Sequence, residues 1–320
     1  MKVSSNLEKI LASGQFAATG ELGPPKSAEA EAIKRKAALL KGLVDAVNIT
    51  DNQTAIVRLS SIAAGRILLE EGVEPIVQMT CRDRNRIAIQ SDLLGAAAMG
   101  IENILCLTGD HQRFGDHPEA RGVFDLDSIQ LIAAVRQMSE GSLLSGQPLK
   151  KAPNFLIGAA ANPCAEPLEM RLIRLEKKVR SGAAFIQTQP VFDLDQFSRW
   201  LEMARRRGLH EKSALLAGVL PVRSAKALEY MAREVPGMRI HPRYLERMRA
   251  AAEPQEEGVA IAVEMIGALR QMEGVAGIHL MPVMWESITP RIIQEAGLMP
   301  AHAPRPACPP CSGGENEAKF

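Results

Sequence analysis

The sequence has few aromatic residues, few cysteines and no surplus of either charge. Only 4% of its 320 residues are aromatic, which disfavours a β-sandwich or a base-stacking surface and leaves Ala, Leu, Ile, Val and Met to build the core. Lys and Arg number 38 against 37 Asp and Glu, so no basic surplus is available to neutralise a row of phosphates, and we expect no nucleic-acid partner. Five scattered cysteines do not make a disulfide framework.

Long hydrophobic runs are absent as well. The apolar stretches fall well short of the roughly 20 residues that a membrane helix needs. The amino-terminal segment carries charges at Lys2, Glu8 and Lys9, where a secretory signal would need a continuous apolar core. With 46% hydrophobic and 23% charged residues the composition is that of a globular protein, and we expect a cytoplasmic location away from membranes.

Short β-type runs alternate with longer helical segments along the chain. The eight predicted strands are 16–22, 46–49, 74–79, 103–108, 155–160, 185–189, 215–220 and 277–282. The predicted helices are 27–40, 56–71, 83–99, one after 127, 167–181, 193–207, 225–234, two between 242 and 273, and 289–296. This alternation indicates parallel strands with helical crossovers, and eight such units predict a single (β/α)8 TIM barrel over residues 1–300.

Two further features bear on domain organisation. Residues 301–320 are rich in Pro, Gly and charge and are predicted to be a flexible tail, which carries the pair Cys308 and Cys311 in a CxxC spacing. The alternative fold is an open doubly wound sheet, which is weakened because neither G-x-G-x-x-G nor G-x-x-x-x-G-K-[ST] occurs in the chain.

Two carboxylates stand at the predicted strand ends, where the reactive groups of a barrel lie. Glu21 ends an uncharged run, and a carboxyl group desolvated there would suit a general acid; the alternative is a glutamate paired with an arginine at the rim. Asp110 follows Gly109, which lets the backbone approach a ligand closely. Its carboxylate could bind the N–H groups of a heterocycle, or it could simply form an Asx-turn that ends the strand.

Other barrel chemistries fit less well. A Schiff-base enzyme needs a lysine on a strand, and none of the eight runs contains one. Glu21, Asp51, Asp110 and Asp193 could form a Mg²⁺ site, but Thr and Gln dominate the strand ends, so a metal-dependent lyase is the less favoured alternative and we expect no metal. On the helix 167–181, three basic side chains share a more exposed face that could hold a cofactor phosphate or be solvated surface: Arg171, Arg174 and Lys178.

Six strand-end motifs together resemble a known family. They are Glu21-x-x-Pro24-Pro25-Lys26, Asn48-Ile-Thr50-Asp51-Asn52, Met79-Thr80-Cys81-Arg82-Asp83, Leu107-Thr108-Gly109-Asp110, Thr188-Gln189-Pro190-x-Phe192-Asp193 and Gly218-Val-Leu220-Pro221-Val222. In this order they resemble the 5,10-methylenetetrahydrofolate reductase family of flavin-dependent barrels, in its bacterial type without a regulatory domain. The resemblance covers roughly residues 10–298.

The resemblance implies a reaction and its catalytic residues. Reduced flavin would pass a hydride from N5 to the methylene carbon of methylenetetrahydrofolate and so give 5-methyltetrahydrofolate. Glu21 aligns with the general acid that protonates N10, and Asp110 aligns with a carboxylate near both the flavin and the bound pterin. Gln189 aligns with a residue that hydrogen-bonds folate.

The resemblance also implies a flavin site, with FAD preferred over FMN. The implied cofactor-binding residues are Thr50, Gln78, Thr108, Gly109, Asp110, Phe124, Asn162, Arg174 and Lys178. Of these, Gln78, Thr108 and Asn162 replace a His, an Arg and a Tyr of better-known bacterial members. The electron donor would be NAD(P)H. The alternative is a flavin- and folate-binding subunit, in a homo- or hetero-oligomer, that receives electrons from a partner protein.

Overall fold

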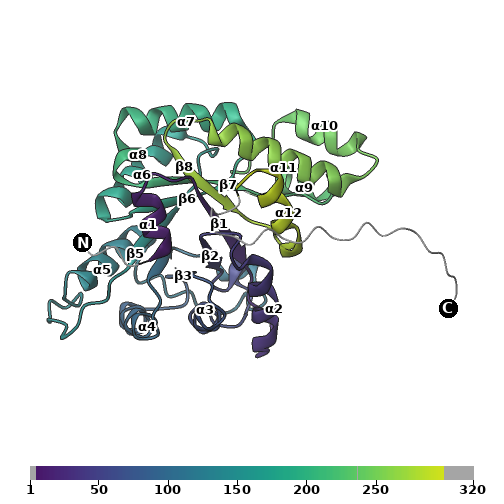
Figure 1. Cartoon of the computed structure of the whole chain (residues 1–320). Coiled ribbons are helices and arrows are strands. Elements are labelled where there is room, and N and C mark those ends of the chain that lie inside the picture. The colour runs from purple at the N-terminus through teal and green to yellow at the C-terminus, as the bar shows by residue number, and fades with distance from the viewer. Residues whose placement is uncertain (1–4, 236, 299–320) are drawn as a thin grey trace, which may run out of the picture.

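The fold is an eight-stranded parallel barrel surrounded by helices, seen in a computed structural model that describes residues 5–235 and 237–298 (Figure 1). The strands pair in sequence order and β8 closes on β1. They are β1 (Ala17–Leu22), β2 (Ala46–Ile49), β3 (Pro75–Thr80), β4 (Asn103–Leu107), β5 (Leu156–Ala161), β6 (Phe185–Pro190), β7 (Ala214–Val219) and β8 (Val275–Leu280). The predicted (β/α)8 barrel is confirmed, whereas the predicted tail 301–320, with Cys308 and Cys311, lies outside the described residues.

Helices follow each strand and pack their apolar faces on the barrel. They are α2 (Ala30–Leu40), α3 (Ser61–Glu70), α4 (Arg86–Ala98), α5 (Ser128–Ser139), α6 (Leu168–Ser181), α7 (Leu194–Arg206), α8 (Leu209–Lys212), α9 (Ala225–Glu234), α10 (Pro242–Ala250), α11 (Pro254–Arg270) and α12 (Thr289–Glu295). The helix predicted from residue 56 begins only at Ser61, because the preceding residues form the short η1 (Gln53–Ala55) with left-handed backbone.

The amino-terminal helix α1 (Asn6–Ala12) was not expected from the sequence, where its charges disrupt any simple apolar run. It closes the amino-terminal end of the barrel, because Leu7 is fully buried among the innermost strand residues. The Glu74 carboxylate accepts hydrogen bonds from the N–H groups of Asn6 and Leu7 at 2.6 and 2.9 Å and so caps the first turn.

The barrel interior is layered, because alternate residues of each strand point inward. The lowest layer is apolar and consists of Ala17, Ala46, Ile76, Leu105, Leu156, Phe185 and Leu216. Gly158 makes room for the Phe185 ring, since a Cβ at that glycine would lie 2.2 Å from Cζ of the ring. Two residues further along the strands the layer is polar, with Thr19, Asn48, Gln187 and His279 buried together. The next layer opens to solvent.

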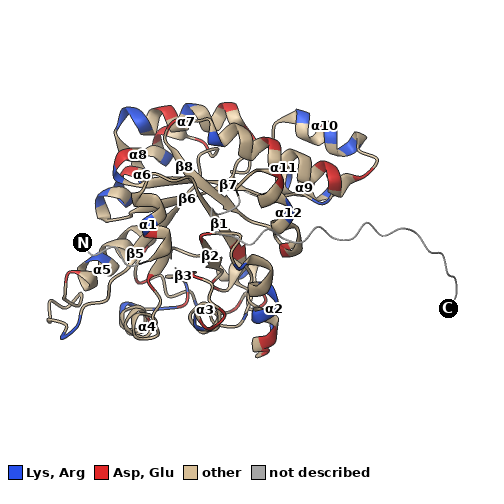
Figure 2. Ribbon diagram, viewed as in Figure 1, with Lys and Arg blue, Asp and Glu red and all other residues tan. Residues whose placement is uncertain are grey.

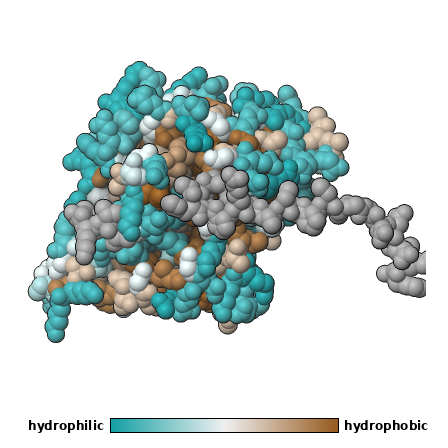
Figure 3. Space-filling view, viewed as in Figure 1, coloured by the Kyte–Doolittle hydropathy of each residue, from teal (hydrophilic) through white to brown (hydrophobic). Residues whose placement is uncertain are grey.

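Charged residues lie mainly on the helices and loops, while the strands carry few (Figure 2). The space-filling view shows hydrophilic residues over most of this face, with smaller hydrophobic areas between them (Figure 3). In the described part of the chain, no helix combines the length and apolar character needed to cross a membrane. The fold therefore leaves the carboxyl ends of the strands as the place to look for a site.

Candidate active site

A cavity of about 570 Å³ opens at the carboxyl ends of the strands. Of the residues predicted to form a site, it is lined by Glu21, Thr50, Gln78, Thr108, Gly109, Asp110, Arg174, Lys178 and Gln189. Phe124 and Asn162 do not line it. Nine candidates scattered over 169 residues of sequence, from Glu21 to Gln189, thus converge on one concave surface, as is typical of a barrel enzyme.

Glu21 lies low in the cavity, with its side chain 13% exposed. Its Oε2 atom accepts a hydrogen bond of 3.4 Å from Nε2 of Gln78 and lies 3.5 Å from Nε2 of His279. Within the described residues, no arginine forms an ion pair with this carboxyl group, so the alternative of a rim salt bridge is wrong. A nearly buried carboxyl group beside an amide and an imidazole, with access to the cavity, is suited to proton transfer.

Thr50 lines the cavity and carries a buried, unpaired hydroxyl group. The residue is 1% exposed, and its Oγ1 atom has no hydrogen-bond partner within the described protein. Buried hydroxyl groups nearly always have a partner, because leaving one unpaired is unfavourable. The missing partner is therefore expected to come from a polar ligand, and a heteroatom of a flavin ring fits this requirement.

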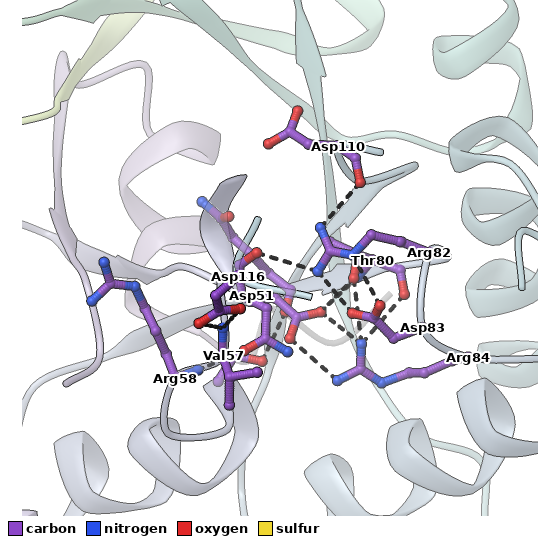
Figure 4. Close-up of polar contacts among 12 residues, drawn as sticks. Asp51, Val57, Arg58, Thr80, Arg82, Asp83, Arg84, Asp110 and Asp116 are labelled. Atoms are coloured by element: carbon purple, nitrogen blue, oxygen red, sulfur yellow. Dashed lines mark hydrogen bonds and ion pairs between the residues drawn. The ribbon is translucent and has the colours of Figure 1, made fainter. Parts of the chain in front are cut away.

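A rim cluster, formed by Asp51, Thr80, Arg82 and Arg84, ties together the loops after β2, β3 and β4 (Figure 4). The Asp51 side chain is 1% exposed and accepts bonds from Arg84 at 2.7 and 3.2 Å and from Thr80 Oγ1 at 2.9 Å. Arg82 is 2% exposed and donates to the backbone carbonyls of Asn52 and Asp110. Sequence reasoning missed both arginines, because their acceptors lie on other loops.

The rim cluster holds a strained loop in place. Asn52, Thr54 and Ala55 all have left-handed backbone, with φ of 46°, 56° and 57°, which is unfavourable for residues other than glycine. Asn52 and Thr54 also line the cavity. Strained backbone conformations persist only where surrounding contacts hold them in place, and here such contacts lie at the edge of a binding site.

Asp110 presents its carboxylate to solvent at the rim. Figure 4 shows this group pointing away from Arg82, whose bond to Asp110 goes to the backbone carbonyl oxygen. Among the described residues no hydrogen bond or ion pair engages the carboxylate, so an Asx-turn does not account for it. The preceding Gly109 has a φ of 92°, and a Cβ there would lie 3.0 Å from both Thr80 and Arg82. Glycine is therefore required to bring Asp110 to the rim.

Helix α6 contributes two cations to the cavity. The predicted exposed face is wrong for Lys178, whose side chain turns inward and donates from Nζ to the Ala160 carbonyl at 2.6 Å. Burial, with a smaller effect from Arg174, lowers the pKa of Lys178 to about 8. Arg171 instead bonds the Glu166 carbonyl and does not line the cavity. Lys178 and Arg174 together could bind a cofactor phosphate.

Two predicted cofactor residues lie elsewhere. Phe124 is 36% exposed and stacks on His111 with ring centroids 6.5 Å apart. Asn162 accepts a bond from the Cys164 N–H. Neither residue contributes to the cavity surface.

His279 is the main residue that sequence reasoning missed. It lies in β8, is 3% exposed, and reaches the Glu21 carboxyl group. The histidines of the sequence suggested nothing because they lack metal-ligand spacing. The signal that could have found it is the alternation of side chains along β8, which places His279 on the same inward face as Gly277 and Met281.

The cavity offers neither a metal site nor an activated thiol. Across residues 5–235 and 237–298, no three His, Cys, Asp or Glu side chains converge to hold a metal ion. Cys81, Cys106 and Cys164 are buried and unpaired. Burial raises the pKa of Cys81 and of Cys164 to about 12, so these groups remain thiols rather than reactive thiolates.

Comparison with known proteins identifies the family. A family profile described as methylenetetrahydrofolate reductase matches residues 6–297. The chain is 25% identical over 301 residues to the 5,10-methylenetetrahydrofolate reductase of Salmonella typhimurium, covering 90% of this chain and 93% of the relative. It is also 25% identical over 235 residues to methylenetetrahydrofolate reductase 1 of Schizosaccharomyces pombe, where it covers 71% of this chain but spans only 36% of the relative.

Among solved structures, one resembles the chain with a TM-score of 0.63 and 16% identity, covering 91% of this chain and 98% of the other. It is an uncharacterised Clostridium thermocellum protein described as binding two copies of 5-methyl-5,6,7,8-tetrahydrofolic acid, and at this identity the likeness supports the shared fold alone. The profile match extends over nearly all of the described chain, and strand-end motifs that suggested the family contribute residues to the cavity described above. The chain belongs to the methylenetetrahydrofolate reductase family.

Proposed function

We propose that this protein reduces 5,10-methylenetetrahydrofolate to 5-methyltetrahydrofolate with a bound flavin, and that Glu21 is the general acid. The observation that carries the proposal is the placement of the Glu21 carboxyl group low in a polar cavity of a chain that belongs to this family. The printed names of the Salmonella and Schizosaccharomyces relatives support the reaction. The folate bound by the Clostridium protein supports the ligand class.

The chain's own residues divide between cofactor and substrate. Flavin would be held by the Thr50 hydroxyl group, by Thr108 and Gly109, and by the cations Arg174 and Lys178 around its phosphate; FAD is preferred over FMN. When bound, this cofactor supplies the hydride that reduces the methylene carbon. The folate would lie against Gln189 and Asp110, whose side chains are exposed at the cavity mouth.

Glu21 performs the proton transfer. Its carboxyl proton passes to N10 of the substrate, the bond between N10 and the methylene carbon breaks, and the electron pair of that bond stays on N10. The methylene carbon is left as an N5 iminium group, which accepts the hydride. Glu21 ends the step as a carboxylate, beside Gln78 and His279.

The decisive experiment pairs a spectrum with a substitution. The purified protein should show the absorbance of oxidised flavin, and the mass of the heat-released cofactor distinguishes FAD from FMN. Glu21→Gln should leave flavin reduction intact while lowering folate turnover by a factor on the order of 10² to 10⁴. Glu31→Gln, an exposed surface change on α2, is the matched control and should turn over normally.

Two outcomes would overturn the proposal. A colourless protein that takes up no added flavin excludes the flavin chemistry, and normal turnover by Glu21→Gln excludes the acid. Rapid mixing with NADH and NADPH decides the electron donor. Bleaching of the flavin by either nucleotide identifies a direct NAD(P)H donor, and bleaching by neither indicates a partner protein.

A further inference from the structure

A buried polar network lies directly beneath Glu21. This interior network consists of Thr19 on β1, Asn48 on β2, Gln187 on β6 and His279 on β8, all at most 3% exposed. Strand register explains part of the arrangement, because Thr19 pairs with His279 across β1 and β8, and Glu21 pairs with Asn48 across β1 and β2. The four side chains replace the apolar filling that usually occupies a barrel interior.

The amide groups of the network satisfy one another. Gln187 donates from Nε2 to Thr19 Oγ1 at 3.1 Å and to Asn48 Oδ1 at 3.2 Å. Asn48 donates from Nδ2 to Gln187 Oε1 at 2.6 Å. Such reciprocal bonds fix both amides and leave little freedom for the remaining member, His279.

The His279 ring is held at both nitrogens. Its Nδ1 lies 3.0 Å from Thr19 Oγ1, and its Nε2 lies 3.4 Å from Asn48 Nδ2 and 3.5 Å from Glu21 Oε2. The Thr19 hydroxyl has two possible acceptors, Nδ1 of His279 and the Ile278 carbonyl oxygen at 3.3 Å. When it donates to Nδ1, Nε2 carries the ring proton, points it at the Glu21 carboxyl group and makes no hydrogen bond with Asn48 Nδ2, which is also a donor. In the other tautomer, Nε2 presents a lone pair, which accepts from Asn48 Nδ2 and which an ionised Glu21 would repel.

We propose that His279 is a positioning residue for Glu21, and that the interior network holds the His279 ring in the orientation this requires. This inference rests on the proposed function. Within the described residues, all polar contacts of the Glu21 carboxyl group involve Oε2, which Gln78 and His279 approach from β3 and β8. Oε1 is left to deliver the proton to N10 of the substrate. The Nε2–H of His279 then donates to Oε2 and stabilises the carboxylate that remains after the proton has left.

The kinetic test uses two substitutions of His279. His279→Leu removes the contact with Oε2 and should lower kcat by a factor on the order of 10 to 100, with KM for the folate little changed, because binding residues are untouched. His279→Gln retains an N–H donor and should recover part of the lost rate. His210→Leu, a half-buried histidine on α8 outside the cavity, is the control. Wild-type kcat in His279→Leu, with folding verified by its Tm, overturns the proposal.

A second test needs no turnover. The ¹⁵N signals of the histidine rings report which nitrogen carries the proton, and the signal lost in His279→Leu identifies His279. In the folate-free protein, at a pH where Glu21 is ionised, His279 should be the Nε2–H tautomer. Glu21→Leu removes the acceptor and should change that signal.

The two tests separate the possible failures. An unchanged His279 signal in Glu21→Leu overturns the pairing, whatever the turnover of the two His279 variants. A wild-type protein that does not reduce methylenetetrahydrofolate, but whose His279 signal responds to Glu21→Leu, contradicts the proposed function while the pairing stands. If both the wild type and His279→Leu reduce methylenetetrahydrofolate normally, the proposed function stands and the positioning role of His279 is wrong.

Discussion

The two sides of the cavity are built differently. The side formed by β2 to β5 and α6 is polar, with the rim cluster, the unpaired Thr50 hydroxyl group and the cations of α6. The side formed by α9 and by the segments that follow β7, β8 and α9 is apolar, with Leu220, Met231, Val235, Met238, Met281 and Val283, although His279 of β8 lines the cavity too. The polar side is fixed by buried ion pairs, whereas the apolar side relies on adaptable methionines. The polar side suits a cofactor that stays bound, and the apolar side suits an aromatic substrate that binds and dissociates in each turnover.

Breaking the rim cluster should give the largest effect. Asp51→Asn removes one member of a buried ion pair and leaves the Arg84 guanidinium, 14% exposed, with a weaker partner. We expect a loss of about 3 kcal/mol in the free energy of unfolding, because Arg84 then keeps a charged partner only in the more exposed Asp92, at 2.8 Å. Urea unfolding measures it. Arg66→Met, which breaks the exposed pair with Glu70, is the control and should lose less than about 1 kcal/mol. Equal losses in the two variants would contradict the buried role.

Lys178 provides a pH-dependent test of the polar side. Its pKa is lowered from 10.5 to about 8 in the folded chain, so the unfolded state binds more protons between these values and the stability contributed by this group rises with pH. Below pH 8, Lys178 is charged in both the folded and the unfolded state, so the full free-energy cost of burying its charge applies. Lys178→Met should therefore stabilise the protein by up to about 3 kcal/mol at pH 7, and by progressively less towards pH 10.

The control is the neighbouring exposed Lys177→Met, which should leave stability unchanged at both pH values. The same Lys178→Met variant should bind flavin more weakly, because it removes a cation proposed to contact the phosphate. A Lys178→Met protein whose stability gain is the same at pH 7 and pH 10 would show that burial does not penalise the charge.

Thr50, which follows β2, and Thr80, which ends β3, form a matched pair. Thr50→Val removes a hydroxyl group without a protein partner, so it should not destabilise the free protein, yet it should weaken flavin binding about tenfold, or ~1.4 kcal/mol. Thr80→Val removes a bond to the buried Asp51 and should destabilise by about 1–3 kcal/mol. Thermal unfolding and flavin titration measure both effects. If Thr50→Val destabilises as much as Thr80→Val, the Thr50 hydroxyl group has a partner within the protein.

The sequence predicted the barrel and much of the polar side for a physical reason. Strand–helix alternation determines the topology, and in a barrel the inward-facing residues at the carboxyl ends of the strands surround a common opening, so Glu21, Thr50 and Gln189 could be placed together without coordinates. What escaped prediction depends on register and on side-chain direction. The bond between Asp51 and Arg84 joins two loops, and the contact between Glu21 and His279 joins the first strand to the last.

Helix termini and turns set a second limit. Helix α1 is stabilised by Glu74, 67 residues away from Leu7 along the chain, which no local pattern announces. Its cap Ser5, which accepts from the Glu8 N–H, is a local signal that sequence reasoning missed. The late start of α3 follows from left-handed residues that are not glycine and therefore leave no mark in the sequence. Lys178 has the spacing of a surface residue, yet its side chain turns inward and its Nζ donates a hydrogen bond to the Ala160 carbonyl oxygen.

The apolar side should show the smallest effect. Met231→Leu on α9 conserves volume and hydrophobicity, so it should change the free energy of unfolding by less than about 1.5 kcal/mol. If this side contacts only the folate, steady-state kinetics should show a modest rise in KM for methylenetetrahydrofolate, with flavin affinity unchanged. Met170→Leu, an exposed methionine on α6, is the control and should alter neither quantity. A Met231→Leu protein that loses flavin but keeps its KM would place the cofactor on the apolar side and reverse the assignment of the two sides.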